Sequence, residues 1–173
     1  LLLMTFLVVG TGKPASAADA RNFVPGNIIS DANFYNGSDM TVSEIQRFLN
    51  QRVSRCTLGD PGREKGKPTT WNGATFLAQN CLKDAKFNTR THAADAYCAA
   101  YRGKNNETAA EIIAKVAQAC NISPKVILIT LEKEQSLVTD DWPTVKMFDI
   151  AMGFACPDTG VNNSANCDST YFG

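Results

Sequence analysis

The sequence predicts a mostly α-helical domain held together by disulfides. Capping boxes at residues 41–44 and 108–111 each open a segment with apolar residues at helical spacing. A serine N-cap at Ser123, followed by Pro124, predicts the start of a further helix, because proline suits the first helical position. No alternating strand pattern of useful length, internal repeat or low-complexity tract accompanies these helical signals.

The N-terminal residues predict export. Residues 1–9 form an apolar run, residues 10–14 break it, and residues 15–17 form a small-x-small cleavage site. We therefore expect a signal peptide over residues 1–17, truncated at its N-terminus because no basic segment precedes the apolar run. A membrane anchor is the alternative, but the run is too short to span a bilayer. We expect a secreted mature chain with no stable membrane insertion after cleavage.

The cysteines agree with export. An even number of cysteines in an exported chain favours disulfides over free thiols. Several connectivities are open, and we predict the sequential one, in which each bridge closes a local loop: Cys56 with Cys81, Cys98 with Cys120, and Cys156 with Cys167. No two cysteines are spaced as Cys-x-x-Cys and His92 is the only histidine, so we predict no structural zinc site. No other metal or organic cofactor is predicted.

The charge balance and the length suit one ordinary exported domain. The 17 basic and 17 acidic side chains form no cluster like a nucleic-acid footprint, so no nucleic-acid partner is expected. Residues 18–40, rich in Asn, Asp, Gly and Pro, predict an extended N-terminal segment, and residues 41–173 predict the helical domain. The last residues directly follow a cysteine-bounded loop, with no closing helix. We therefore expect the domain to be incomplete at its C-terminus.

Each predicted helix presents one apolar face. In the helix opened by Thr41, that face contains Ile45, Phe48, Leu49 and Val53. In the helix opened by Thr108, it contains Ile112, Val116, Ala119 and Cys120. Asn121 can end this second helix in the left-handed conformation, so the helix should form a hairpin with the one that starts at Pro124.

Two segments between these helices differ in composition. Residues 57–72 contain Gly, Pro, Lys and Arg with almost no apolar residue, which predicts a long exposed loop tied at its ends by Cys56 and Cys81. Residues 91–101 are rich in alanine and predict a further helix, which contains Cys98.

The helix that starts at Pro124 carries an acid where an apolar residue is expected. At about 100° per residue, one stripe contains Ile127, Leu131, Glu134 and Val138. A globular helix buries such a stripe, so Glu134 is predicted to point inward while Glu132 points to water. Burial raises the pKa of a carboxyl group, as in the general acid of a glycosidase. The alternative is a glutamate at the edge of the core, lifted to solvent or paired with an arginine.

Further candidate site residues follow this helix. Asp140 and Asp141 come just past its end, so either could face the same cleft as Glu134 and serve as a second carboxylate. Trp142 and Tyr171 could stack on sugar rings and bind substrate. The alternative interpretation is that the aspartates are plain loop residues and that the tryptophan belongs to the core.

The segment from Pro124 to Ser136 resembles the catalytic helix of goose-type lysozymes and soluble lytic transglycosylases. In those enzymes a Glu-Ser pair ends such a helix, whereas here Gln135 separates Glu134 from Ser136. Their Gly-rich motif, which shapes the cleft, corresponds loosely to residues 151–154 (AMGF), and their later Tyr-bearing motif is not evident. The resemblance implies a lysozyme-like fold, Glu134 as the catalytic acid and Gly153 beside the substrate.

A second resemblance covers nearly the whole mature chain. It rests on the segments FVPGNIISD (23–31), MTVSEIQRFLN (40–50), LEKEQSLV (131–138) and AMGFACPDT (151–159). These segments are similar to those of secreted actinobacterial proteins labelled haemagglutinin-related or hypothetical, many of which carry cell-wall-binding repeats. This resemblance implies a function at the cell wall without defining an activity.

Together these features predict a secreted, lysozyme-like helical domain that cleaves peptidoglycan glycan strands. Glu134 would be the single general acid of a glycosidase or a lytic transglycosylase, and a hydrolase would also need a base such as Asp140 or Asp141. The expected partner is peptidoglycan or another cell-wall glycan, and the expected location is extracellular, including the cell wall. The alternative is a non-catalytic cell-wall or glycan-binding module or adhesin, in which Glu134 is paired structurally.

Overall fold

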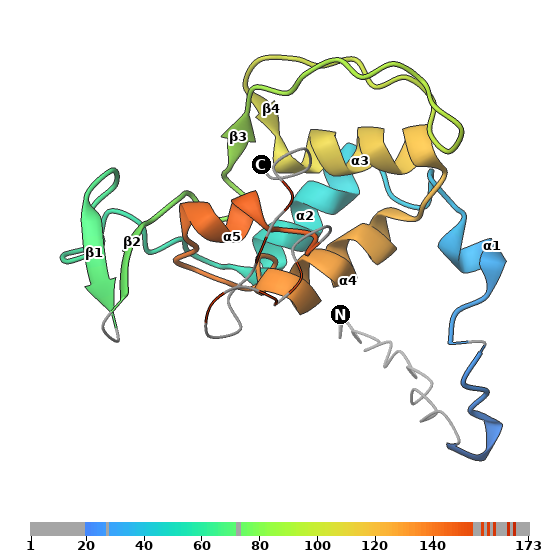
Figure 1. Ribbon diagram of the computed structural model, residues 1–173, viewed down its shortest axis with the longest axis horizontal. Helices are drawn as coiled ribbons and strands as arrows, with labels where there is room; N and C mark the ends of the chain where they lie inside the picture. The colour runs from blue at the N-terminus through green and yellow to red at the C-terminus, as the bar shows by residue number, and fades with distance from the viewer. Residues whose placement is uncertain are drawn as a thin grey trace, which may run out of the picture. The chain divides into compact units, whose positions relative to one another are not determined.

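The computed structural model describes residues 20–26, 28–71 and 74–153, together with residues 157, 159, 161, 166 and 168. The chain divides into two units, residues 1–30 and residues 31–173. In the first unit, the described residues include one 3-10 helix, η1 (Ala20–Asn22). All other helices and strands named below belong to the second unit (Figure 1). The predicted signal peptide, residues 1–17, lies outside the described residues.

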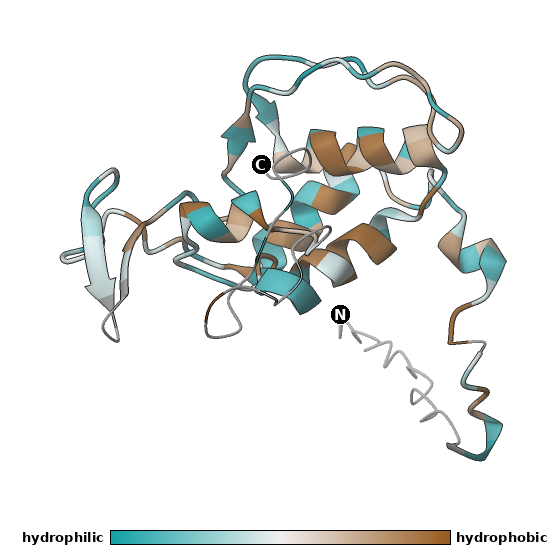
Figure 2. Ribbon diagram, in the orientation of Figure 1, coloured by the Kyte–Doolittle hydropathy of each residue, from teal (hydrophilic) through white to brown (hydrophobic). Residues whose placement is uncertain are grey.

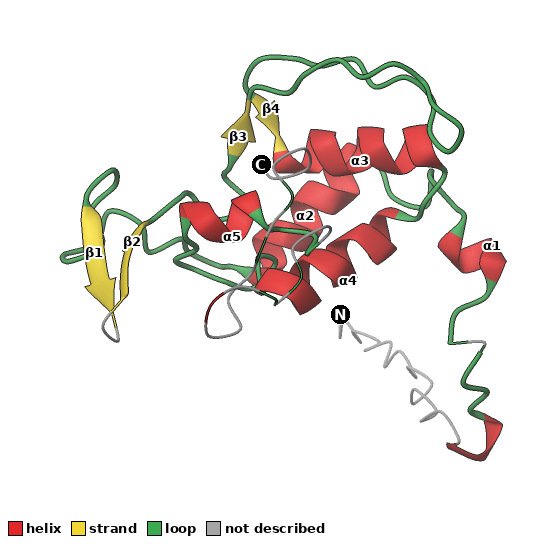
Figure 3. Cartoon of the chain, viewed as in Figure 1, coloured by secondary structure: helices red, strands yellow, loops and turns green. Residues whose placement is uncertain are grey.

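The second unit combines helices with two small antiparallel sheets. Its helices are α1 (Asp31–Phe34), α2 (Val42–Arg52), α3 (Ala109–Cys120), α4 (Pro124–Gln135) and α5 (Val145–Asp149). Its strands are β1 (Pro68–Trp71), β2 (Ala74–Leu77), β3 (Lys86–Phe87) and β4 (Glu107–Thr108). Strand β1 pairs with β2, and β3 pairs with β4 (Figure 3).

The prediction of a mostly α, lysozyme-like domain is wrong. Where the structure describes the chain, 35% of it is helical and 11% lies in strands, so the fold is mixed. The β1–β2 hairpin extends into residues 57–72, which were expected to form an exposed loop. Trp71 pairs with Ala74, so Asn72 and Gly73 separate the strands. An Asn-Gly pair between short runs rich in threonine and aromatic residues is a hairpin signal. The loop prediction rested only on the polar composition of residues 57–72 and did not use this signal.

The predicted helix over residues 91–101 is also absent. These residues belong to the long loop over residues 88–106 that joins β3 to β4. His92 and Tyr101 pair across it, with N–H to carbonyl distances of 2.9 and 3.0 Å in the two directions. Asp95 accepts hydrogen bonds from the backbone N–H groups of Tyr97 and Cys98, which form a turn instead of a helix. Tertiary pairing and local turn chemistry therefore override the helical propensity of alanine.

The helix boundaries predicted from capping signals are confirmed. Thr41 and Thr108 each form a complete capping box at the start of α2 and α3. Asn121 ends α3 in the left-handed conformation, with φ at 51°. The Ser123 hydroxyl accepts the N–H of Lys125 at the start of α4. Local hydrogen bonds thus decide where these helices start and where α3 ends.

The core lies where α2, α3 and α4 meet, and Figure 2 shows hydrophobic residues along α3 and α4. Ile45 and Leu49 of α2 are fully buried, as predicted. On α3, however, the buried side is made of small residues and one isoleucine: Ala109, Ala110, Ile113, Ala114 and Ala117. The face predicted from Ile112 and Val116 is only half-buried. Small side chains let α3 lie close against its neighbours, which leaves its larger apolar residues on the outer side.

Gly37 illustrates how closely α3 is packed. A Cβ atom on Gly37 would overlap the carbonyl oxygen of Ala117, a backbone atom that cannot turn aside. We expect Gly37→Ala to lower the free energy of unfolding by about 2 kcal/mol, measured by urea denaturation. Gly26→Ala is the control, because a Cβ atom there would meet nothing within 4 Å. Equal stability of the two variants would contradict this account of the packing.

Two disulfides of the predicted sequential pairing are formed, Cys56–Cys81 and Cys98–Cys120. The first joins the segment after α2 to the segment after β2. The second joins the long loop to the last residue of α3. Cys156 and Cys167 lie outside the described residues.

Candidate functional site

Glu134 lies in the last turn of α4, at the edge of the core. Ile127, Leu131 and Val138 are buried, as the apolar stripe predicts, but 32% of the Glu134 side chain is exposed. Helix α4 ends at Gln135, so the stripe does not enclose the acid from both sides. The expectation that Glu134 points into an apolar wall is therefore wrong, and the carboxylate can be reached from solvent.

One carboxylate oxygen of Glu134 is bound by the neighbouring lysine. The ammonium group of Lys133 donates to Oε1 at 2.9 Å, and this contact raises the pKa of Lys133. Because 77% of the Lys133 side chain is exposed, the ion pair contributes little to stability. The second oxygen, Oε2, has no hydrogen bond to any residue that the structure describes. Among the described contacts, the pair with Lys133 therefore engages only Oε1.

Gly153 lies directly against this free oxygen. A Cβ atom on Gly153 would come within 2.8 Å of Oε2, closer than real Cβ contacts. Gly153 also has φ at +65°, a conformation that favours glycine. The turn after α5 places it there, with its N–H donated to the carbonyl of Ile150 at 3.0 Å. Two residues proposed for the site are thus in contact although they are distant in the sequence.

The candidate second carboxylates bind other groups. Asp140 accepts the backbone N–H of Trp142 at 2.7 Å, and burial, with a contribution from Asp141, raises its pKa. Asp141 is exposed and forms an ion pair with Arg63 at 3.8 Å. Neither aspartate has a hydrogen bond or ion pair with Glu134 among the described contacts. The structure therefore does not pair either one with Glu134.

Trp142 is engaged within the protein. Its ring meets Phe76 of β2 edge to face, with centroids 5.2 Å apart, and the guanidinium of Arg63 lies 4.4 Å from its centroid. These contacts hold the β1–β2 hairpin against the segment before α5 and cover one face of the indole. Sugar stacking on that face would require Arg63 to move. Tyr171, the other aromatic candidate, lies outside the described residues.

An apolar groove of about 440 Å³ runs along α3 and α4, close in sequence to this site although neither Glu134 nor Gly153 lines it. On α4 it is lined by Thr130 and Leu131, which precede Glu134 by about one turn. It is also lined by Met152, the residue before Gly153. Sequence reasoning missed this groove because it assigned the larger apolar residues of α3, Ile112 and Val116, to the core. They are only half-buried and line the groove, and Val116 also packs against the core.

A second apolar pocket, of about 580 Å³, is lined by residues of α2 and α4. Phe48, Leu128 and Ile129 line it, and Arg52 and Lys125 add positive charge. None of the residues predicted to bind or cleave substrate lines this pocket. Its link to the candidate site is Lys133, the ion-pair partner of Glu134, which lines it.

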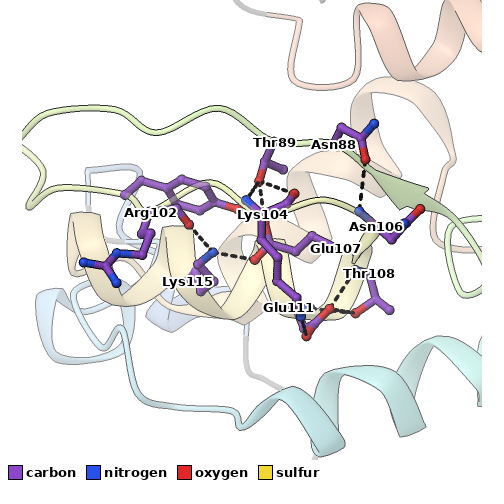
Figure 4. Close-up of polar contacts among 10 residues, drawn as sticks. Asn88, Thr89, Arg102, Lys104, Asn106, Glu107, Thr108, Glu111 and Lys115 are labelled. Carbon is purple, nitrogen blue, oxygen red and sulfur yellow. Dashed lines mark hydrogen bonds and ion pairs between the residues drawn. The ribbon is translucent and has the colours of Figure 1, made fainter.

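Sequence reasoning also missed a buried polar cluster at the start of α3 (Figure 4). The side chain of Glu107 is 1% exposed and accepts hydrogen bonds at 2.6 Å from Thr89 and Tyr101. Lys115 of α3 also donates to it and to the carbonyl oxygen of Arg102. Burial opposes ionisation of Glu107, but these hydrogen bonds outweigh it and lower its pKa. The cluster fastens both arms of the long loop to α3.

A family model described as the LasA N-terminal domain matches residues 27–165. The chain belongs to this family. LasA itself is a secreted staphylolytic protease. The comparison does not support the predicted haemagglutinin-related family or the resemblance to lysozymes. Searches of curated proteins and of solved structures found no match.

Membership of the LasA N-terminal domain family, together with the disulfides, fits an extracellular, cell-wall-related protein. In the part of this LasA N-terminal domain that the structure describes, no helix is long and apolar enough to cross a membrane. Over the same residues, no group of three or more His, Cys, Asp or Glu side chains is placed to hold a metal ion.

Proposed function

We propose that this domain acts at the cell wall by cleaving the glycan strands of peptidoglycan, with Glu134 as the general acid. The observation that carries the proposal is the contact between the Glu134 carboxylate and Gly153. Lys133 binds Oε1, no described residue forms a hydrogen bond with Oε2, and the absence of a side chain at Gly153 leaves room beside Oε2. A glycosidic oxygen could approach the acid there.

The neighbouring groove supports a sugar substrate. It is apolar along α3 and α4, and two of its lining residues are close in sequence to the proposed site: Leu131 lies three positions before Glu134, and Met152 is next to Gly153. N-acetylated sugars present methyl groups and apolar ring faces that such a surface can bury. A sugar bound there would also displace water from Glu134.

The proposed reaction needs one proton transfer at the breaking bond. Glu134 donates its proton from Oε2 to the glycosidic oxygen as the bond between that oxygen and the anomeric carbon breaks. The departing sugar leaves as an alcohol. The anomeric carbon is then attacked by a hydroxyl of the same sugar, which closes an anhydro ring, or by water, and the attacking oxygen gives up its proton to the Glu134 carboxylate, which restores the acid. Because Asp140 and Asp141 make their contacts elsewhere, the first route is favoured here.

A non-catalytic cell-wall-binding module is the second candidate. The favouring observation is that Glu134 is ion-paired with Lys133 and partly exposed, an arrangement common in structural surface pairs. In that case the groove would bind wall glycan and the carboxylate would only contribute a contact. Binding without cleavage separates this function from the first.

The test is the release of soluble fragments from purified peptidoglycan. We expect Glu134→Gln to reduce release by about 100-fold or more while leaving the melting temperature unchanged. Glu132→Gln is the matched control, because Glu132 lies on the same helix but accepts hydrogen bonds from Thr139. Masses of the products distinguish anhydro ends from reducing ends. A folded wild type that binds peptidoglycan but releases nothing would refute cleavage and support the binding module.

A further inference from the structure

A polar pocket of about 890 Å³ lies under the long loop that joins β3 to β4. The two arms of this loop run alongside α3 (Figure 1). The outer face of α3, with Ile112 and Val116, lines one side of the pocket. Arg90, His92 and Asp95 of the loop line it as well. The pocket therefore joins an apolar helix face to charged and polar loop residues.

The pocket is held in shape at both ends of α3. At the C-terminal end, the loop is fixed by the Cys98–Cys120 disulfide and by a 2.7 Å hydrogen bond from Ala99 to the carbonyl of Ala119. At the N-terminal end, it is fixed by the buried cluster around Glu107. A ligand that enters such a fixed site loses little energy to reordering of the protein.

Several polar groups in the pocket have no hydrogen-bond or ion-pair partner among the described residues. Neither the guanidinium of Arg90 nor the imidazole of His92 has a hydrogen bond or ion pair with any residue that the structure describes. Asp95 uses Oδ1 for the backbone of Tyr97 and Cys98, and no described contact uses Oδ2. The free groups thus include a cation and a carboxylate oxygen above an apolar surface. Short peptides with both acidic and amino groups match this combination.

The polar pocket and the apolar groove border the same part of α3. Both are lined by Ile112, Val116 and Cys120. A ligand that lies in the groove and crosses these three residues would come to the pocket that Arg90 lines. In peptidoglycan, the group attached to the sugar is a stem peptide, which carries free carboxylates and, at its diamino acid, an amine.

We propose that the polar pocket binds the stem peptide of peptidoglycan, an inference that rests on the proposed action on the glycan strand. Arg90 binds a carboxylate of the peptide, and Oδ2 of Asp95 accepts a hydrogen bond from the peptide's ammonium group. The apolar side of the pocket packs against the alanine methyl groups. The domain then recognises a glycan strand that still carries its peptide, and it discriminates against bare glycan.

Calorimetric titration with the free stem tetrapeptide, L-alanyl-γ-D-glutamyl-L-lysyl-D-alanine, tests this proposal. We expect Arg90→Gln to weaken binding by about tenfold, because a charge-assisted hydrogen bond is lost. Arg102→Gln is the matched control, since Arg102 lies in the same loop but does not line the pocket. This control should bind the peptide within about twofold of the wild type.

Three outcomes would overturn the assignment. These are no binding of the tetrapeptide by the wild type, equal binding by the wild type and Arg90→Gln, and equally tight binding of an acidic L-peptide of the same length. The last result would indicate docking of acidic proteins instead. Glu134→Gln should bind the tetrapeptide as tightly as the wild type, because Glu134 does not line this pocket. If the wild type binds the tetrapeptide but cleaves no glycan, only the proposed function is refuted. Cleavage of bare glycan without peptide binding refutes only the stem-peptide site.

Discussion

Replacing Glu107 by alanine is expected to lower the free energy of unfolding by about 3 kcal/mol, measured by urea denaturation at neutral pH. The change removes the acceptor shared by Thr89, Tyr101 and Lys115. It leaves their polar groups in a site from which water is largely excluded, because Glu107 is 1% exposed. The loop would also lose its attachment to the start of α3.

The same cluster predicts how this loss depends on pH. Since the pKa of Glu107 is lower in the folded chain than its usual 4.5, the ionised cluster stabilises the fold at pH values above 4.5. That stabilisation disappears as the pH falls through the lowered pKa. The difference between wild type and Glu107→Ala should therefore shrink in acid. Glu64→Ala, at an exposed glutamate, should cost less than about 0.5 kcal/mol at any pH. A difference that does not change with pH would contradict ionised Glu107 as the stabilising form.

Removing the Cys56–Cys81 disulfide is expected to cost about 3 kcal/mol, because the cross-link restricts the unfolded chain over a separation of 25 residues. Alanine at both positions avoids leaving a free thiol. Cys81 is fully buried, so its loss also leaves a small cavity. Thermal unfolding of the double variant, compared with the oxidised wild type, measures the effect.

The control for this experiment is chemical reduction. Reductant should lower the melting temperature of the wild type by at least as much as the double substitution does. It should have a smaller effect on the double variant, which retains Cys98–Cys120. If the double variant melts at the same temperature as the wild type, the disulfide does not stabilise the folded domain.

Local signals predicted the helices well because their causes are local. Thr41, Thr108 and Ser123 form hydrogen bonds within the first turn of their helices, and Asn121 needs only its own backbone conformation. Such features depend on residues a few positions apart. The Asn72-Gly73 hairpin signal is equally local, but the polar composition of residues 57–72 favours an exposed loop, and the loop was predicted instead.

The remaining differences come from contacts between residues distant in the sequence. Alanine-rich residues 91–101 form a loop because Cys98 bonds to Cys120 and His92 pairs with Tyr101. The buried side of α3 could not be chosen from periodicity, because apolar residues occur on both sides of the helix. Glu107 is buried only because Thr89, Tyr101 and Lys115 converge on it, and no spacing in the sequence predicts that cluster.

The candidate site was predicted in part. Glu134 and Gly153 were chosen separately, one from its place in an apolar stripe and the other from a resemblance, and the structure brings them into contact. The burial of Glu134 was overestimated because helical spacing was extended past Gln135, where α4 ends. The pocket under the long loop required the tertiary position of that loop and could not be predicted.

The two attachments of the long loop also affect how the chain withstands proteases outside the cell. Arg90, Arg102 and Lys104 are exposed sites for trypsin-like enzymes. Cleavage needs a stretch of backbone to detach first, and here detachment requires the Glu107 cluster to open. A cut after Arg102 or Lys104 would fall between Cys98 and Cys120, so the disulfide would keep the two fragments covalently joined. The domain could be nicked there and remain one molecule.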